Sequence, residues 1–362
     1  MLTVLIILLT LLYVSIFTSF IYGWRKLVYF DTSTSDDDLP TISVVVACKD
    51  EAQKLPCLLE SLSKQSFPNY QLILVNDHST DSTLQVMNDA KIMFNDLTVI
   101  SCSQSGKKQA LREGIQQSKA ELILTTDADC IPCATWVETF AHYYQHHRSN
   151  MIIGPVTMSN HASLISQLQH LEFASMVASG GGAAALGAAI LCNGANLGFE
   201  RSTWLRCQSE LRMDIPSGDD MFLLQSIKRR GGTISFLKST NAMVTTVTAA
   251  TLEAFITQRT RWASKSTAYT DGHIILVSLV VMAMCVMQVV LVLASIFLNL
   301  QITYWLTLFT IKLLTDGLFV WNFKSFFGIE NPVKNTLILS AIYPIYVLFI
   351  GIRSLMTKHT AW

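Results

Sequence analysis

Long apolar runs lie at both ends of the chain, and short apolar runs alternate with polar stretches in its middle. An apolar run needs about 20 residues to cross a bilayer as a helix. Two runs, at residues 2–24 and 274–298, meet that length, and two others approach it near the C-terminus, at residues 302–320 and 336–352. The pattern predicts an N-terminal transmembrane anchor over residues 1–24 and a C-terminal transmembrane region of about three spans over residues 273–362.

The middle of the chain has the sequence pattern of an α/β domain. A polar, turn-rich linker, residues 25–40, leads into four short β-branched runs at residues 41–47, 70–76, 96–101 and 120–126. Helix-compatible stretches separate these runs, at residues 52–65, 81–94 and 106–119. Strands that alternate with helices over short connections form a mostly parallel sheet covered on both faces. We therefore expect one α/β domain over residues 41–272.

Composition and charge support a membrane protein. Of the 362 residues, 51% are hydrophobic and 14% are charged, whereas soluble domains carry about 25% charged residues. The net charge is zero and no basic cluster of the nucleic-acid-binding kind stands out, which excludes nucleic acid as an expected partner. Arg25 and Lys26 follow the first apolar run. An uncleaved anchor with a cytoplasmic middle domain is therefore expected, as at a bacterial inner membrane.

Two features of the sequence leave their interpretation open. Arg353 and Lys358 fit the expected orientation less well, because an even number of spans places the C-terminal tail outside the cytoplasm; one C-terminal segment would then be interfacial or re-entrant.

Cys130 and Cys133 form a lone C-x-x-C with no second pair. The absence of a second pair favours reduced thiols over a zinc site.

Polar residues follow each of the expected strands, in the sequences "CKDEA", "NDHSTDS", "SCSQSGKK" and "TTDADC". Ligands of parallel sheets bind at the carboxyl ends of the strands, so these residues are candidates for one site. Asp127 and Asp129 stand two positions apart after an apolar strand. In an extended segment they point the same way, so both can reach one divalent cation.

A second pair of acids, Asp219 and Asp220, follows a Pro-Ser-Gly turn at the expected start of a helix. Acids at a helix start can simply cap it and match its dipole. A carboxylate there can instead act as a general base. The residues themselves leave both interpretations open.

The segment "FITQRTRWASKS", residues 255–266, stands close to the C-terminal apolar runs. Its cationic and aromatic side chains can anchor at the bilayer surface. Alternatively, the planar guanidinium of Arg261 can bind a phosphate through two hydrogen bonds.

The segment Ala178–Trp204, upstream of these residues, begins with small residues. Such residues can pack against another backbone in a membrane, line an acceptor passage or form a linker.

Six stretches together resemble a known family. "VVVACKDEA", "LVNDHSTDST", "GKKQAL", "DAD", "SGDDMFL" and "QRTRW" occur in this order over about residues 41–262. They resemble the motifs of membrane-integrated, inverting family 2 glycosyltransferases of the GT-A fold and the Q-x-x-R-W type. Two positions depart from the family pattern: Asn76 replaces the first aspartate of a pair, and Asp219 replaces the usual glutamate.

The resemblance implies a role for each matching residue. Asp220 would be the catalytic base. Asp127 and Asp129 would hold Mg²⁺ or Mn²⁺. The nucleotide-sugar donor would meet Asp50, Glu51, Asp77, Lys107, Gln258 and Arg261, and the acceptor would meet Asp219 and Trp262.

It also implies a function, namely transfer of a sugar from a nucleotide donor, expected to be UDP-linked, to a membrane lipid. Ceramide glucosyltransferase and bacterial glycolipid synthases resemble the chain in their number of spans. The alternative is a processive polysaccharide synthase of the hyaluronan or poly-N-acetylglucosamine type. A membrane receptor or transport subunit with a nucleotide-binding domain is a third possibility, which the lack of a P-loop or G-x-G-x-x-G disfavours. A noncatalytic scaffold is a fourth, disfavoured by the intact acidic motifs.

Overall fold

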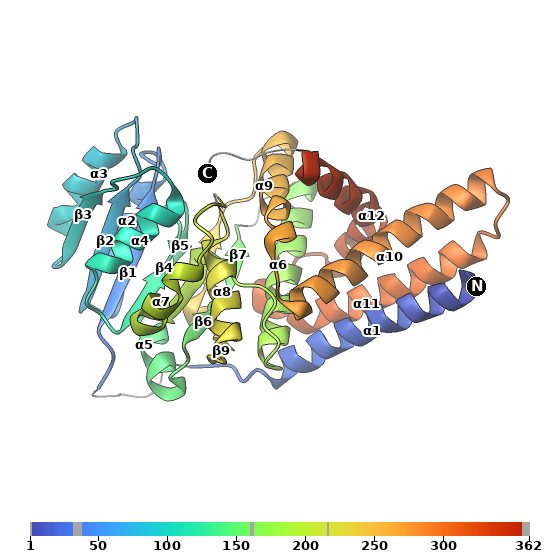
Figure 1. Ribbon diagram of the computed structural model, residues 1–362, viewed down its shortest axis with the longest axis horizontal. Coiled ribbons are helices and arrows are strands. Elements are labelled where there is room, and N and C mark those ends of the chain that lie inside the picture. Colours follow the sequence, from blue (N-terminus) through green and yellow to red (C-terminus); the bar gives the residue numbers. More distant parts are fainter. Residues whose placement is uncertain (1, 32–37, 160–162, 216, 357–362) are drawn as a thin grey trace. The chain divides into compact units, whose positions relative to one another are not determined.

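A computed structural model describes residues 2–31, 38–159, 163–215 and 217–356. The chain divides into two compact units, whose elements are labelled in Figure 1. Within the described residues, the α/β unit comprises 27–31, 38–159, 191–215 and 217–247, and the helical unit comprises 2–26, 163–190 and 248–356.

The α/β unit is built on a seven-stranded sheet in the order β3-β2-β1-β4-β8-β6-β9. The strands are β1 (Ile42–Cys48), β2 (Tyr70–Asn76), β3 (Leu97–Ser101), β4 (Leu122–Thr125), β6 (Met151–Ile153), β8 (Leu197–Glu200) and β9 (Ile234–Phe236). Neighbouring strands pair in parallel except for β8, which runs antiparallel to both β4 and β6. The expected mostly parallel α/β fold is therefore confirmed, and the first four strands match the four β-branched runs.

Helices and a second, smaller sheet complete this unit. The helices are α2 (Leu55–Ser63), α3 (Thr83–Asp89), α4 (Lys107–Gln117), α5 (Trp136–His147), α7 (Arg201–Cys207) and α8 (Asp219–Arg229). The smaller sheet has the order β5 (Ile131–Pro132), β10 (Val244–Thr246) and β7 (Val156–Met158). Short 3₁₀ turns are η1 (Ala90–Met93), η2 (Gly194–Asn196), η3 (Gln208–Glu210) and η4 (Thr240–Ala242).

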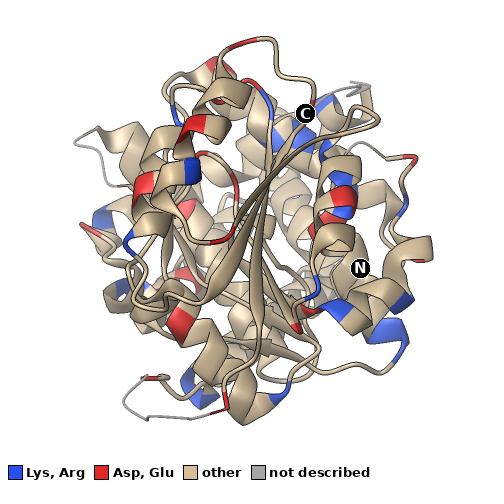
Figure 2. Cartoon of the chain, turned by 90° about the vertical axis from the view of Figure 1, so that its left-hand side faces the viewer, with Lys and Arg blue, Asp and Glu red and all other residues tan. Residues whose placement is uncertain are grey.

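The strands are buried because their side chains pack on both faces of the sheet. All seven residues of β1 are buried, and Val44, Val45 and Val46 are fully inaccessible. Apart from Glu200, the last residue of β8, the strands of the seven-stranded sheet carry no charged residue, and Figure 2 shows the acidic and basic positions mainly in helices and loops. The charged side chains of this unit are therefore carried almost wholly by its helices and loops.

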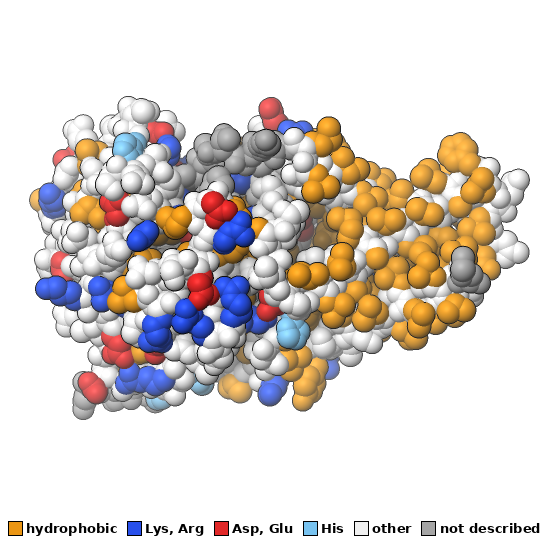
Figure 3. Space-filling view, in the orientation of Figure 1, with side chains coloured by type: hydrophobic (Ala, Val, Ile, Leu, Met, Phe, Trp, Pro, Cys, Tyr) orange, Lys and Arg blue, Asp and Glu red, His pale blue; other side chains and the backbone are white. Residues whose placement is uncertain are grey.

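The helical unit contains α1 (Leu2–Lys26), α6 (Leu164–Ala184), α9 (Leu252–Ser264), the 3₁₀ turn η5 (Ser266–Ala268), α10 (Gly272–Phe297), α11 (Thr303–Phe327) and α12 (Pro332–Met356). Within the described part of the chain, α1, α10, α11 and α12 are long and apolar enough to cross a membrane. Orange hydrophobic side chains cover much of the face that α1, α10 and α11 present in Figure 3. Helices α6 and α9, from within the expected catalytic domain, group with this unit; the expected domain boundaries remain predictions.

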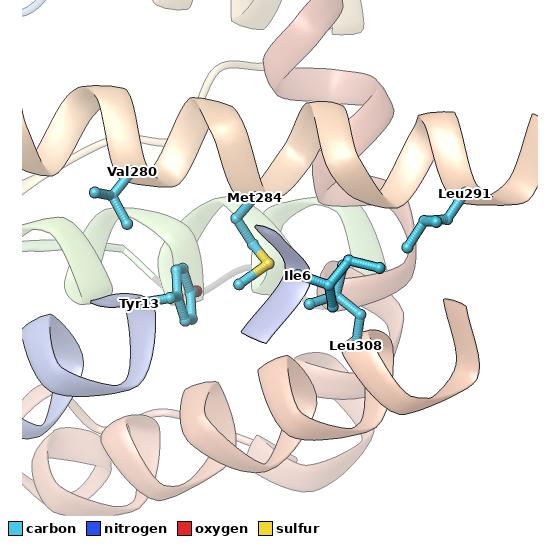
Figure 4. Close-up of a cluster of buried hydrophobic side chains, with 6 residues drawn as sticks. All are labelled: Ile6, Tyr13, Val280, Met284, Leu291 and Leu308. Carbon is cyan, nitrogen blue, oxygen red and sulfur yellow. The ribbon is translucent and has the colours of Figure 1, made fainter. Parts of the chain in front are cut away.

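Apolar side chains and one ion pair hold the helical bundle together. Side chains from α1, α10 and α11 form a buried cluster of Ile6, Tyr13, Val280, Met284, Leu291 and Leu308 (Figure 4). Asp316 pairs with Lys312 one turn earlier on α11, and its other oxygen accepts a hydrogen bond from the Tyr13 hydroxyl at 2.7 Å. The acidic side chain of α11 is thus neutralised inside the bundle, as a charge within apolar surroundings requires.

Two glycines bring α1 and α6 into backbone contact. A Cβ atom built on Gly182 would lie 2.4 Å from the Phe20 carbonyl oxygen, and one built on Gly23 would lie 1.9 Å from the Gly182 carbonyl oxygen. Neither backbone can shift cheaply. The small residues at the start of Ala178–Trp204 therefore belong to a closely packed helix rather than to a linker, as small residues do between membrane helices.

We expect Gly182→Ala to lower the free energy of unfolding by about 1–3 kcal/mol, because the added methyl group must push α1 away from α6. Gly317→Ala is the matched control, since Gly317 lies within α11 and a Cβ atom there would meet nothing within 4 Å. Thermal unfolding of the detergent-purified chain measures both changes. Equal melting temperatures for the two variants would contradict the close crossing.

Candidate functional site

Acidic residues converge at the carboxyl ends of β1, β2 and β4. Because β1 pairs in parallel with both of its neighbours, the three strands end at the same edge of the sheet. Asp50 and Glu51 follow β1, Asp77 follows β2, and Asp127 follows β4. The five acids expected from the sequence at this edge, Asp129 included, thus all stand on loops that leave it.

Asp127 and Asp129 form a set of oxygen ligands suited to a divalent cation. Together with Cys130, their ligand atoms all lie within 4.8 Å of one another. Burial raises the pKa of the Cys130 thiol well above its usual value. Two half-buried carboxylates are the donors that Mg²⁺ or Mn²⁺ takes together with phosphate oxygens. The residues present therefore fit the expected metal.

Lysines surround these two carboxylates. Lys107, at the first position of α4, donates a hydrogen bond to Asp127. The Lys54 ammonium lies 3.8 Å from Asp129 and 3.4 Å from Glu51. Burial, opposed by the nearby Lys54 charge, raises the pKa of Glu51. This edge of the sheet therefore carries both carboxylates, which can bind a metal ion, and lysine ammonium groups, which can bind a diphosphate.

Asp50 and Asp77 shape the loops at this edge. Asp77 is 0% exposed, and both of its carboxylate oxygens lie 2.9 Å from the Gly106 backbone nitrogen, which precedes Lys107. Asp50, at a positive φ of 53°, accepts hydrogen bonds from the Thr80 backbone and hydroxyl. Contacts of either residue with a nucleotide remain predictions.

Asn76, the departure from the family pattern, is also nearly buried. Its side-chain oxygen accepts a hydrogen bond from the Ser79 backbone nitrogen at 3.2 Å. An amide oxygen can accept this bond as a carboxylate oxygen does, so the contact with the loop after β2 is kept despite the replacement of the aspartate.

Asp220 is tied to the end of β4 through Gly194. The Gly194 backbone nitrogen donates to Asp220 Oδ2 at 3.1 Å, and the Gly194 carbonyl accepts from the Thr125 hydroxyl at 3.0 Å. Thr125 is the last residue of β4, two positions before Asp127. The proposed base and the proposed metal ligands are therefore anchored to one strand end. Gly194 belongs to the "NGANLGF" stretch that precedes the acidic pair.

Asp219 and Asp220 also border a pocket. Helix α8 begins at Asp219 after Gly218, whose φ of 85° suits glycine at this sharp turn. The pocket beside them has Thr125, Trp204 and Lys108 among its lining residues. Contact of Asp219 with an acceptor remains a prediction.

Lys108 fixes the loop that leads to this acidic pair. Its side chain is 6% exposed and lies 4.5 Å from the centre of the Phe222 ring. The ammonium group donates to the carbonyl oxygens of Arg212 at 2.9 Å and Leu211 at 3.3 Å. Helix α4 therefore touches the metal side of the site through Lys107 and the base side through Lys108.

We expect Lys108→Met to lower kcat by about tenfold or more, because two carbonyl groups lose a charged donor at a cost of about 1–3 kcal/mol. Lys119→Met, at an exposed lysine shortly after the same helix, is the matched control. Steady-state rates of sugar transfer, with melting temperatures measured in parallel, test this expectation. Equal kcat values for the two folded variants would show that the Lys108 contact is dispensable.

Gln258, Arg261 and Trp262 lie on α9, which belongs to the helical unit. All three side chains are half-buried. Within the described residues, the Arg261 guanidinium makes no hydrogen bond or ion pair, so it is open to an anionic ligand. Contacts of these residues with donor or acceptor remain predictions.

Sequence reasoning missed several charged residues that touch the candidate site. Lys54 was hidden in a stretch interpreted only as a helix, and Lys108 occupies an unspecified position of the G-K-x-x-A-L pattern. The run of charges in "CKDEAQK" was a usable signal for Lys54. No signal in the sequence marks Lys108, because its partners are backbone carbonyl groups about a hundred residues away.

Residues 40–265 match the protein-family model described as glycosyltransferase like family 2. This range spans the acidic edge of the sheet, the acidic pair at α8 and helix α9.

Curated relatives include poly-beta-1,6-N-acetyl-D-glucosamine synthases. The protein from Staphylococcus epidermidis is 30% identical over 146 residues, which are 38% of this chain and 33% of the relative. That from Staphylococcus aureus (strain COL) is 26% identical over 168 residues, which are 44% of this chain and 39% of the relative. The matches thus span less than half the length of these relatives.

A solved structure shares the fold over nearly the whole chain. It is a mannosyltransferase from Pyrobaculum calidifontis in complex with GDP-Man and Mn²⁺, with a TM-score of 0.63 and 16% sequence identity. The similarity covers 97% of this chain and 100% of that one. The GT-A-like fold expected from the sequence is therefore confirmed.

Proposed function

Because the chain belongs to the glycosyltransferases of family 2, we propose that it transfers a sugar, with inversion, from a UDP-linked donor to a membrane-bound acceptor. The observation that carries this proposal is the link through Gly194 between Asp220 and the strand end that bears Asp127 and Asp129. A base and a candidate metal pair are thereby anchored to one strand end. Transfer to an acceptor hydroxyl needs both groups at one centre.

The donor would bind along the acidic edge of the sheet. Asp50, Glu51 and Asp77 would line the nucleoside side, and Lys107 would meet the diphosphate. Asp127 and Asp129 would hold Mg²⁺ or Mn²⁺, which as a Lewis acid would offset the charge that develops on the departing phosphate. Support comes from the Mn²⁺ and GDP-Man bound in the mannosyltransferase of similar fold.

The chemical step would be a single displacement. Asp220 takes the proton of the acceptor hydroxyl as its oxygen attacks the anomeric carbon. The bond from that carbon to the β-phosphate oxygen breaks, and the electron pair leaves with the nucleoside diphosphate. Arg261, with a guanidinium open to an anion, and Gln258 would bind that leaving group. Asp219 and Trp262 would hold the acceptor.

A lipid is the acceptor we propose. Four helices long and apolar enough to cross a membrane accompany the α/β unit, and these would keep the chain at the surface where lipids are found. Arg25 and Lys26, at the end of α1, favour a cytoplasmic α/β unit by the positive-inside rule.

Polymer synthesis is the second candidate, favoured by one observation. Both relatives named above are poly-beta-1,6-N-acetyl-D-glucosamine synthases by name, and they match 146 and 168 residues of this chain. We therefore place UDP-N-acetylglucosamine first among the donors to be tested, whichever acceptor is used.

The test is incubation of the detergent-purified chain with Mn²⁺, a panel of UDP-sugars together with GDP-mannose, and a total membrane lipid extract. Lipid-dependent release of UDP together with one discrete glycolipid would support the proposal. A ladder of long glycans would establish polymer synthesis instead. No sugar transfer from any nucleotide-linked donor, GDP-mannose included, by a folded protein would contradict both candidates.

A further inference from the structure

Two arginines on α9 have opposite surroundings. Arg261 is half-buried, and its guanidinium has no polar partner within the described residues. Arg259, two positions earlier, is 3% exposed. Its Nε and Nη2 atoms both donate to Glu172 Oε2 of α6, at 3.0 and 2.8 Å. The pattern that marks α9 in the sequence uses Arg261 and leaves Arg259 without a role.

Glu172 is held from a second side as well. Its other oxygen, Oε1, accepts a hydrogen bond from the Tyr346 hydroxyl of α12 at 2.9 Å. Both carboxylate oxygens are therefore occupied, and the side chain is 6% exposed. Glu172 thus joins α6, α9 and α12 at one buried point.

Arg259, which Glu172 holds in place, also contacts the side chains of two neighbours on α9, Gln258 and Trp262. Its Nη1 atom donates to the Gln258 side-chain oxygen at 3.0 Å. Its guanidinium carbon lies 4.3 Å from the centre of the Trp262 ring. Because the Gln258 oxygen is taken, its NH₂ group is left to donate, which is the polarity that phosphate and hydroxyl oxygens need. One face of Trp262 is likewise covered by a cation.

We propose that Glu172 and Arg259 are positioning residues, which set the donor direction of the Gln258 amide and the plane of Trp262. This proposal rests on the proposed function, because it assumes that Gln258 and Trp262 meet substrates. A purely structural role explains the pair less well. Burying two charges costs several kcal/mol per ion, and an apolar pair of similar volume often stabilises a protein as well or better.

Three variants of the full-length protein separate positioning from stability. Arg259→Lys keeps the charge beside Glu172 but loses the planar fork that reaches Gln258 as well. Glu172→Leu combined with Arg259→Met replaces the ion pair by an apolar pair that can refill the space. Glu253→Gln, at an exposed acid in the first turn of α9, is the matched control.

We expect the lysine variant and the double variant to lower kcat for transfer by about 10- to 100-fold, as displaced positioning groups do. The double variant should still fold, with its melting temperature lowered only by the loss of the acceptor of the Tyr346 hydroxyl. The metal concentration for half-maximal activity should stay unchanged in both, since Asp127 and Asp129 are untouched. The control should match the wild type in kcat and KM.

A double variant that folds and transfers sugar at the wild-type rate would overturn the positioning role and leave the proposed function intact. So would an activity loss that only follows the unfolded fraction. Absence of transfer by the wild type, with no difference from Asp220→Asn, would contradict the proposed function itself and this proposal with it.

Discussion

Asp220→Asn should lower the rate of sugar transfer by about 10²- to 10⁴-fold, the usual contribution of a general base. Asparagine keeps one side-chain oxygen, which can accept the hydrogen bond from Gly194 but not also the one that the Met221 backbone nitrogen donates to Asp220 Oδ1, so the melting temperature is measured in parallel. The proton of the acceptor hydroxyl then has no base to receive it. Donor binding should change little, because the amide removes no metal ligand.

Rates of UDP release at saturating acceptor, with the KM of the donor, measure this expectation. Asp89→Asn, at an exposed aspartate that ends α3, is the matched control and should behave as the wild type. A fall of less than about threefold in the transfer rate of Asp220→Asn would exclude this carboxylate as the base. Loss of a general base is expected to cost about 100-fold or more, and each tenfold loss in rate corresponds to about 1.36 kcal/mol.

The second large effect is expected at the metal pair. Asp127→Asn and Asp129→Asn should each lower transfer by about 10³-fold or more, because the Lewis acid contributes several kcal/mol to the transition state. Removal of metal by a chelator should abolish wild-type activity, and added Mn²⁺ or Mg²⁺ should restore it.

Metal binding can also be followed without turnover. A ligand at a hundred times its dissociation constant stabilises the folded state by about 2.7 kcal/mol. Mn²⁺ with UDP should therefore raise the melting temperature of the wild type and of Asp89→Asn, and should leave both metal-pair variants unchanged. An equal rise in all four proteins would place the metal elsewhere.

The strands and the acidic residues at their ends were predictable, because short β-branched runs alternate with helix-compatible stretches and each run is followed by polar residues. Four β-branched runs became β1 to β4, and the acids after them gathered at one edge because parallel strands share a direction. The expected helix at residues 81–94 divides instead into α3 and η1. Local sequence was sufficient to place a residue that directly follows a strand, because the end of that strand fixes its position at the edge of the sheet.

Side-chain partners far apart in the sequence were not predictable. Nothing local says that Arg259 is buried and Arg261 open, because packing of α9 against α6 decides which face of the helix turns inward. The helical state of Gly180–Gly182 is a second example. Glycine costs about 1 kcal/mol in a helix, yet α6 continues through these residues, where Gly182 meets the backbone of α1.

The most direct test of the central claim is the configuration of the first product, followed by NMR of the anomeric proton. The purified chain would receive Mn²⁺, an α-linked UDP-sugar that it accepts and its acceptor. A single displacement driven by Asp220 predicts a β-linked product from the first turnover. An α-linked product would contradict an inverting mechanism and the role assigned to Asp220.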